Sequence, residues 1–127
     1  MAAKRQKFDV RLLTKDNFSY LRLDIFGDEE INVNDVNLIA QMCKEKGGGE
    51  VLPLLIIVDE YTLPSAEARK FIAQKDSNPY AKAEAYVIKD LSQKIVGNFF
   101  LKVDKPARPT KIFSNEQDAL EWLKKFI

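Results

Sequence analysis

The run VLPLLIIV, residues 51–58, has no charged or hydrophilic side chain on either face. A strand with one face in water alternates between apolar and polar residues, so an unbroken apolar run indicates a strand that is covered on both faces. Such strands lie in the middle of α/β sheets. The run is too short to cross a bilayer, which takes roughly 20 residues. We therefore expect a central strand of a protein that does not span a membrane.

Two alternating segments precede this strand. Residues 8–12 and 20–25 place an apolar side chain at every second position, which is typical of strands with one buried face. Lys15, Asp16 and Asn17 between them are turn-forming residues. The pattern predicts an antiparallel hairpin at the edge of the sheet, and the exposed hydrogen-bonding groups of such an edge allow a homodimer.

Four segments have helical spacing. The first, residues 36–43, has Asn34 or Asp35 available as N-cap and ends at the glycines 47–49. A short second helix starts near Ser65 and ends before residues 77–79. The other two follow the predicted strands 83–88 and 111–113.

The third helix covers residues 91–103, where Leu91, Ile95, Phe99 and Val103 recur every four residues; we expect Phe99 in the core. The fourth covers residues 119–126. Ser114 to Gln117 has the form of a capping box at its start.

The resulting order of elements is ββαβαβαβα. Repeated strand-helix-strand units predict one α/β domain over residues 1–127, with residues 1–7 as a disordered tail. Its sheet is mixed and mostly parallel, with about five strands, an N-terminal edge hairpin and about four helices. A chain of 127 residues can bury a sufficient core without metals or disulfides.

Composition excludes several chemistries. The chain has no histidine, which removes Ser-His-Asp and Cys-His catalysis and histidine-ligated zinc. We predict neither a metal nor a cofactor. The formal charge of +1 gives no overall field for nucleic acid. The single cysteine, Cys43, lies on an apolar helix face as a core residue, and a reducing cytoplasm is the expected compartment.

Three polar segments have an ordinary structural explanation. Residues 28–30 lack the ligand spacing of a calcium loop and are read as a solvated turn. The glycines 47–49 follow a helix, whereas a phosphate loop precedes one. Asp59 and Glu60 are adjacent carboxylates with no evident partner group, so an enzymatic role is the least favoured hypothesis.

The junction after the central strand, Asp59 to Arg69, reads DEYTLPSAEAR and passes from an acidic turn through Ser65 to a helix. This arrangement resembles the STAS-like domains, which include anti-sigma-factor antagonists and the cytoplasmic domains of sulfate transporters. The resemblance is strongest with bacterial STAS-like proteins that share a fold with CRAL-TRIO lipid-binding domains. Their recurring C-terminal segments match residues 85–88, 91–103, 109–113 and 119–123.

The resemblance implies a function for Ser65. In anti-sigma-factor antagonists a serine at this place is phosphorylated, and the phosphate disrupts binding to a partner kinase. Their motif is Asp-Ser-Ser/Thr-Gly, whereas this chain has Leu63-Pro64-Ser65-Ala66. Ser65, or Thr62 if the helix begins earlier, is alternatively only an N-cap, with Pro64 in the first turn.

The sequence therefore supports two functional hypotheses. The first is a non-enzymatic regulatory domain that binds a protein partner, a kinase or another regulator. The second is a small-molecule or lipid carrier of the CRAL-TRIO type. Loops at the carboxyl ends of parallel strands are the usual binding sites in α/β sheets. We predict a ligand or partner surface at Asp59, Tyr61, Thr62 and Ser65, with Trp122 as a possible exposed contact residue.

Overall fold

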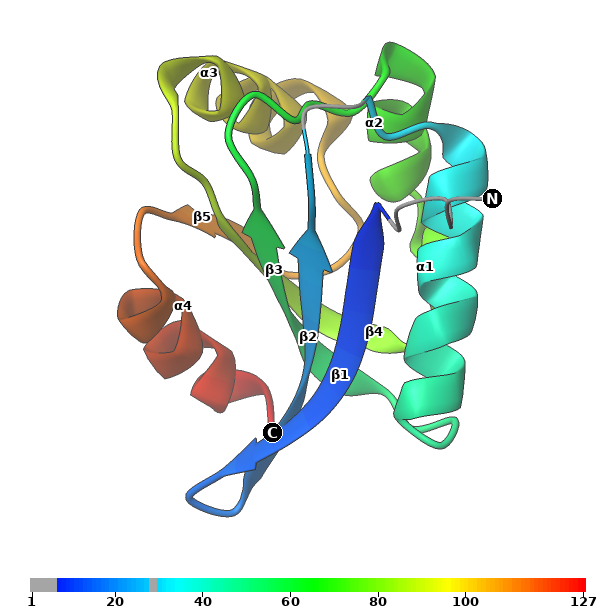
Figure 1. Cartoon of the computed structure of the whole chain (residues 1–127), viewed down its shortest axis with the longest axis vertical. Helices are drawn as coiled ribbons and strands as arrows, with labels where there is room; N and C mark the ends of the chain where they lie inside the picture. Colours follow the sequence, from blue (N-terminus) through cyan, green and yellow to red (C-terminus); the bar gives the residue numbers. More distant parts are fainter. Residues whose placement is uncertain (1–6, 28–29) are drawn as a thin grey trace, which may run out of the picture.

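A computed structural model describes residues 7–27 and 30–127 (Figure 1). Its sheet has five strands in the order β1-β2-β3-β4-β5; β1 and β2 are antiparallel and the other neighbours are parallel. The strands are β1 (Phe8–Lys15), β2 (Phe18–Ile25), β3 (Leu52–Val58), β4 (Ala81–Val87) and β5 (Thr110–Phe113). The helices are α1 (Val33–Lys46), α2 (Ala66–Ile72), α3 (Leu91–Phe99) and α4 (Glu116–Leu123). Short helical turns cover Lys75–Ser77, Phe100–Asp104 and Lys124–Phe126. The predicted single α/β sheet with an edge hairpin is confirmed.

The hairpin is closed by a two-residue turn. Asp16 and Asn17 both have positive φ angles, 53° and 64°. Two successive residues of this kind match the right-handed twist of the flanking strands, and Asn and Asp adopt the conformation at low cost. The turn fixes the register of the whole pair, from Lys15 opposite Phe18 to Phe8 opposite Ile25.

Helices cover both faces of the sheet. Side chains of α1 and α2 join one buried cluster, whereas Ala119 and Leu123 of α4 join a second cluster on the opposite face. Figure 1 shows α4 apart from α1 and α2, with the sheet between them. The segment after α3 lies on the α1 and α2 face. The ring of Phe100 packs edge-on against that of Tyr86, with 6.3 Å between ring centroids, and Tyr86 packs against the α1 and α2 cluster.

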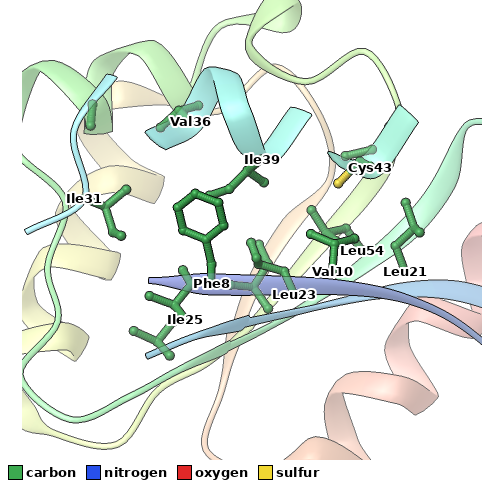
Figure 2. Packing of buried hydrophobic residues seen from close by; sticks show 14 residues of the cluster. Phe8, Val10, Leu21, Leu23, Ile25, Ile31, Val36, Ile39, Cys43 and Leu54 are labelled. Atoms are coloured by element: carbon green, nitrogen blue, oxygen red, sulfur yellow. The ribbon is translucent and has the colours of Figure 1, made fainter. Parts of the chain in front are cut away.

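The central strand contributes to both clusters. Leu54 and Ile56 belong to the α1 side, whereas Leu55 belongs to the α4 side, and all three are fully buried. This arrangement confirms the two-sided cover that the apolar run predicts. Figure 2 shows the larger cluster, in which Phe8 of β1 reaches towards Ile39 of α1.

Cys43 lies in the same cluster and is fully buried (Figure 2). Burial disfavours the thiolate and raises the pKa of the Cys43 thiol to about 11. The sulfur also accepts an N–H from the Asn78 side chain at 3.6 Å. Cys43 is thus a core residue, as predicted.

Two predicted helix caps were wrong by one to three residues. Helix α1 is capped by Asn32, not by Asn34 or Asp35; the Asn32 side chain accepts the N–H of Asp35, whose carboxylate accepts the N–H of Asn32. Helix α4 is capped by Asn115 and not by Ser114. In both cases the capping asparagine accepts the backbone N–H three residues ahead, which an asparagine side chain does well.

The prediction for the third helix was partly wrong. The α-helix ends at Phe99 and continues as one wider π-helical turn over Phe100–Asp104. Phe99 lies outside the core, with 45% of its surface exposed. The buried residues of this segment are Gln93 and Phe100. The row that recurs every four residues therefore faces away from the sheet.

The N-terminal tail and the turn at residues 28–30 are described only in part, and the end of α2 differs from the prediction. The expected disordered tail, residues 1–7, lies outside the described residues except for Lys7, whose carbonyl accepts the N–H of Phe26. Of the predicted turn 28–30, only Glu30 is described. Helix α2 ends at Ile72, five residues before the expected stop. In the described ranges, no helix is both long and apolar enough to cross a bilayer.

Candidate functional site

The loops after β2, β3 and β4 meet at the edge of the sheet where the parallel strands end (Figure 1). Hydrogen bonds join them. The hydroxyl of Thr62, after β3, donates to the carbonyl of Gly27, after β2. The backbone N–H of Tyr61 donates to the carboxylate of Asp90, after β4, at 2.8 Å. The loop after β3, which the sequence predicts as the functional junction, is therefore the middle member of an assembly of three loops.

Gln93 fastens this assembly to α3. The residue is 4% exposed and lies in the first turn of the helix. The amide nitrogen donates to the carbonyls of Asp59 at 2.6 Å and Thr62 at 3.1 Å. The amide oxygen accepts the N–H groups of Lys89 at 2.8 Å and Asp90 at 3.4 Å. Sequence reasoning missed this residue, because a glutamine at the third helical position is also common in ordinary capping boxes.

The two aspartates of the site are bound to backbone N–H groups. The Asp59 carboxylate accepts those of Gly27 and Glu60, and that of Asp90 accepts those of Tyr61 and Gln93. These bonds stabilise the charged form and lower the pKa of both carboxylates. Lys89 adds an ion pair to Asp59 at 3.4 Å. Both carboxylates therefore stay charged and hold the loops together by accepting hydrogen bonds, and they do not act as proton donors.

Tyr61 and Thr62 take opposite positions. Tyr61 has a φ of 66°, and 68% of its surface is exposed. Thr62 is only 2% exposed. Of these two predicted surface residues, Tyr61 is available to a partner and Thr62 holds the loop in place.

Ser65 is the N-cap of α2. Its hydroxyl oxygen accepts the backbone N–H of Ala68 at 3.0 Å. Its own N–H donates to the carbonyl of Ile31 at 2.9 Å, and Ile31 also forms an isolated parallel bridge with Pro64. Pro64 thus precedes the cap and lies outside the first turn. The prediction that Ser65 caps this helix is confirmed, whereas phosphorylation of its hydroxyl stays a prediction.

Replacing Ser65 with alanine should lower the free energy of unfolding by about 1 kcal/mol, because the N–H of Ala68 loses its acceptor. Ser65→Asp should keep most of that stability, since aspartate also caps helices. Urea unfolding monitored by circular dichroism measures both changes. Ser114→Ala is the matched control, because Ser114 is exposed and caps no helix. An equal loss in Ser65→Ala and Ser114→Ala would contradict the assignment.

Trp122 lies elsewhere. It belongs to α4, on the opposite face of the sheet, and is half-buried between Phe113 at 5.8 Å and Phe126 at 4.8 Å between ring centroids. It packs as the edge of the second cluster. The structure does not bring Trp122 together with Asp59, Tyr61 and Ser65.

An exposed apolar row lies beside the three-loop assembly. Its members are Leu91, Ile95, Phe99 and Val103, with 70%, 61%, 45% and 58% of their surfaces exposed. The four-residue spacing places them along one side of α3 and its π-helical extension, and we call them the α3 row. Tyr61 lies at its first turn, because Tyr61 is hydrogen-bonded to the N-cap Asp90.

An apolar cavity of about 100 Å³ lies beneath α3, between this helix, α2 and the sheet. Its lining includes Ile25, Val58, Ile72, Val96 and Phe100. Gly97 faces Ile112 so closely that a methyl group in place of its hydrogen would lie 2.3 Å from the Ile112 side chain. A larger residue here would require the end of the Ile112 side chain to move.

A buried polar cluster was also missed from the sequence. Glu84 of β4 is 3% exposed, and its carboxylate pairs with Arg108 at 3.6 Å and accepts the hydroxyl of Tyr86 at 3.0 Å. Burial raises the pKa of Glu84 and that of Tyr86. The other Arg108 N–H groups donate to the carbonyls of Ile72, Gln74 and Lys75 and to the hydroxyl of Ser77.

The cluster fixes the loop before β5 onto the end of α2. A second ion pair, Arg69 to Asp104 at 2.6 Å, joins α2 to the end of the α3 extension, and the Arg69 guanidinium lies 4.7 Å from the ring centre of Phe99. In the sequence Glu84 alternates with Ala83 and Ala85 and shares its side of β4 with the exposed Lys82, so its burial gives no detectable signal. Its partner Arg108 is distant in sequence and gives none.

The family model of the domain of unknown function DUF7793 matches residues 20–127 of the sequence. The chain belongs to the DUF7793 family. No curated protein matches the chain.

A solved structure resembles this member of the DUF7793 family along nearly its whole length. It is an uncharacterised DUF3478-family protein from Shewanella loihica PV-4 with a SpoIIAA-like fold. The TM-score is 0.61 at 19% identity, over 97% of this chain and 98% of the other. The STAS-like fold that the sequence resemblance implies is therefore confirmed, and this degree of identity shows the fold alone.

Proposed function

We propose that this protein is a non-enzymatic, regulatory protein-interaction domain that binds its partner through the α3 row and Tyr61. The observation that carries the proposal is the exposure of four large apolar side chains in line on α3 and its π-helical extension. Contiguous apolar surface of this kind typically marks an interaction site, because leaving it in water is unfavourable. Anchors spaced by four residues suit a helix that packs into a groove or against another helix.

The neighbouring loops support binding more than catalysis. The carboxylates of Asp59 and Asp90 are occupied by backbone N–H groups. Gln93 and Thr62 are used to join the loops. This rigid assembly holds Tyr61 and the start of the α3 row in fixed positions, which lowers the entropy lost on binding.

The lipid-carrier alternative has less support. The cavity beneath α3 is apolar, as a lipid site would be, but it holds about 100 Å³. Sites for drug-sized ligands typically have roughly 300–1,000 Å³. A lipid chain would require α3 to move away from the sheet.

Replacing Ile95 with glutamate should abolish partner binding, because a charge in the middle of the α3 row cannot be buried without an opposite charge. The measurement is affinity capture from the native host with quantitative mass spectrometry. At least one protein should be enriched about tenfold or more by the wild type over Ile95→Glu, a difference of about 1.4 kcal/mol.

Leu38→Glu is the matched control. Leu38 is an exposed apolar residue on α1, 48% exposed and on a different helix. It should capture the same proteins as the wild type. If Ile95→Glu and the wild type capture identical sets of proteins, the α3 row is not the interaction surface.

A further inference from the structure

We infer that the partner presents carboxylates beside its apolar contact residues, as an acidic amphipathic helix does. This inference rests on the proposed function and specifies its partner. It comes from charged residues beside the α3 row, which that proposal does not use.

Two lysines flank the row on one side. Lys94 lies three residues after Leu91, and Lys102 three residues after Phe99, so both are helical neighbours of the row. Both are exposed. Neither ammonium group has a hydrogen bond or ion pair within the described part of the chain. Between them lies the uncharged Asn98. The flank is therefore basic along the length of the helix.

This segment contains no compensating acid. Residues 91–103 include no aspartate or glutamate. The acids at its two ends are already bound, Asp90 to backbone N–H groups and Asp104 to Arg69. A partner that covers the α3 row consequently places the residues at the margin of its contact surface beside the free ammonium groups of Lys94 and Lys102. Carboxylates at that edge would pair with them, raise the association rate and disfavour other partners.

A second copy fits this surface less well. In an antiparallel pair of α3 helices related by a twofold axis, equal flanks face each other, so Lys94 of one copy would lie near Lys102 of the other. In a parallel pair, the lysines would face the flank of Ser92 and Val96. Neither arrangement offers a carboxylate from the helix, and like charges in contact are destabilising.

An anionic membrane also fits less well. Glu60 is exposed, and 45% of the Asp59 side chain is accessible. Both belong to the loop that is hydrogen-bonded to the first turn of α3. A membrane in contact with the α3 row would bring the exposed Glu60 carboxylate near anionic headgroups, whereas the charge of Asp59 is paired with Lys89. A protein edge with acids opposite Lys94 and Lys102 avoids that repulsion.

The test uses two designed helical peptides with one identical leucine row. In one peptide the row is flanked by glutamates and in the other by lysines. Each is titrated into the isotope-labelled full chain and followed by amide NMR shifts. We expect the glutamate peptide to shift amides of residues 91–103 and to bind at least about tenfold more tightly than the lysine peptide, with an affinity that falls as salt rises.

Lys94→Glu/Lys102→Glu should reverse this preference, whereas the control Lys44→Glu/Lys46→Glu, at the exposed end of α1, should keep it. Equal affinity for both peptides would overturn the inference. So would flotation with phosphatidylserine-containing vesicles that Ile95→Glu abolishes, or a dimer in light scattering that the same change dissolves.

Capture from the host separates the two proposals. If proteins are lost with Ile95→Glu and also with Lys94→Glu/Lys102→Glu, both proposals are supported. If they are lost only with Ile95→Glu, the α3 row binds a partner but the acidic partner is wrong. If Ile95→Glu loses none, the proposed function itself fails, whatever the peptides do.

Discussion

Arg108→Met is expected to lower the free energy of unfolding by about 3–5 kcal/mol, the typical cost of removing one partner of a buried ion pair. Methionine fills a similar volume but leaves the Glu84 carboxylate without a cation. It also removes the N–H donors that bind three carbonyls at and beyond the end of α2. Chemical denaturation followed by circular dichroism measures the loss.

The matched control is Arg11→Met. Arg11 also forms ion pairs, but 52% of its side chain is exposed, and surface pairs contribute less than about 1 kcal/mol. A similar loss for both variants would contradict the account, because burial of the Arg108 pair would then have no effect.

The pH dependence gives an independent check of the same cluster. Burial raises the pKa of Glu84 above its ordinary value of 4.5, so the folded state binds a proton more readily than the unfolded chain. For such a group stability is highest at low pH and falls as pH rises through the folded pKa. Without Arg108 the pKa of Glu84 rises further. The loss in Arg108→Met should therefore be larger at about pH 7 than at about pH 4.5.

Gln93→Leu is expected to cost about 2–4 kcal/mol, because leucine fills the space but makes no hydrogen bond. The carbonyls of Asp59 and Thr62 lose their donor, and the N–H of Lys89 loses its acceptor. These groups lie at the junction of three loops, so the substitution should also loosen the first turn of α3. Hydrogen exchange of the amides of residues 59–65 and 89–95 should become faster.

The control for this variant is Gln117→Leu. Gln117 is exposed in the first turn of α4. Its replacement should change stability by less than about 0.5 kcal/mol. If Gln93→Leu were equally mild, the three loops would not depend on the glutamine, and the fixed position of Tyr61 would need another cause.

Local patterns predicted most of the fold. The apolar run 51–58 predicted a central strand, because backbone period and burial on both faces are properties of the segment itself. The alternation in β1 and β2, with the turn at Asp16 and Asn17, predicted the hairpin. Ser65 was predicted as a cap from its position before a helix. None of these features requires knowledge of a distant residue.

The features that were missed depend on tertiary contacts. A row of apolar residues at every fourth position shows that a helix has an apolar side. Gln93 and Phe100, seven positions apart, also lie on one side of a helix, and it is this side that faces the sheet. Gly97 lies against Ile112 of β5, a contact between distant segments that no local pattern reveals. The pairing of Glu84 with Arg108 likewise joins residues from different segments.

The candidate site was predicted in part. The structure places Asp59, Tyr61, Thr62 and Ser65 at one edge of the sheet and Trp122 on another face. Sequence reasoning placed the surface in the loop after β3, where the chain is polar. The larger apolar surface lies on α3, whose exposed residues looked like core residues in the sequence.

Site-specific photo-cross-linking from position 95 tests the proposed function most directly. A photoreactive amino acid replaces Ile95 in the native host, and cross-linked proteins are identified by mass spectrometry. The account predicts a discrete cross-linked partner from position 95 and none from position 38 on α1, where the exposed Leu38 serves as control. Absence of a specific product from position 95, or the same products from both positions, would contradict a docking surface on α3.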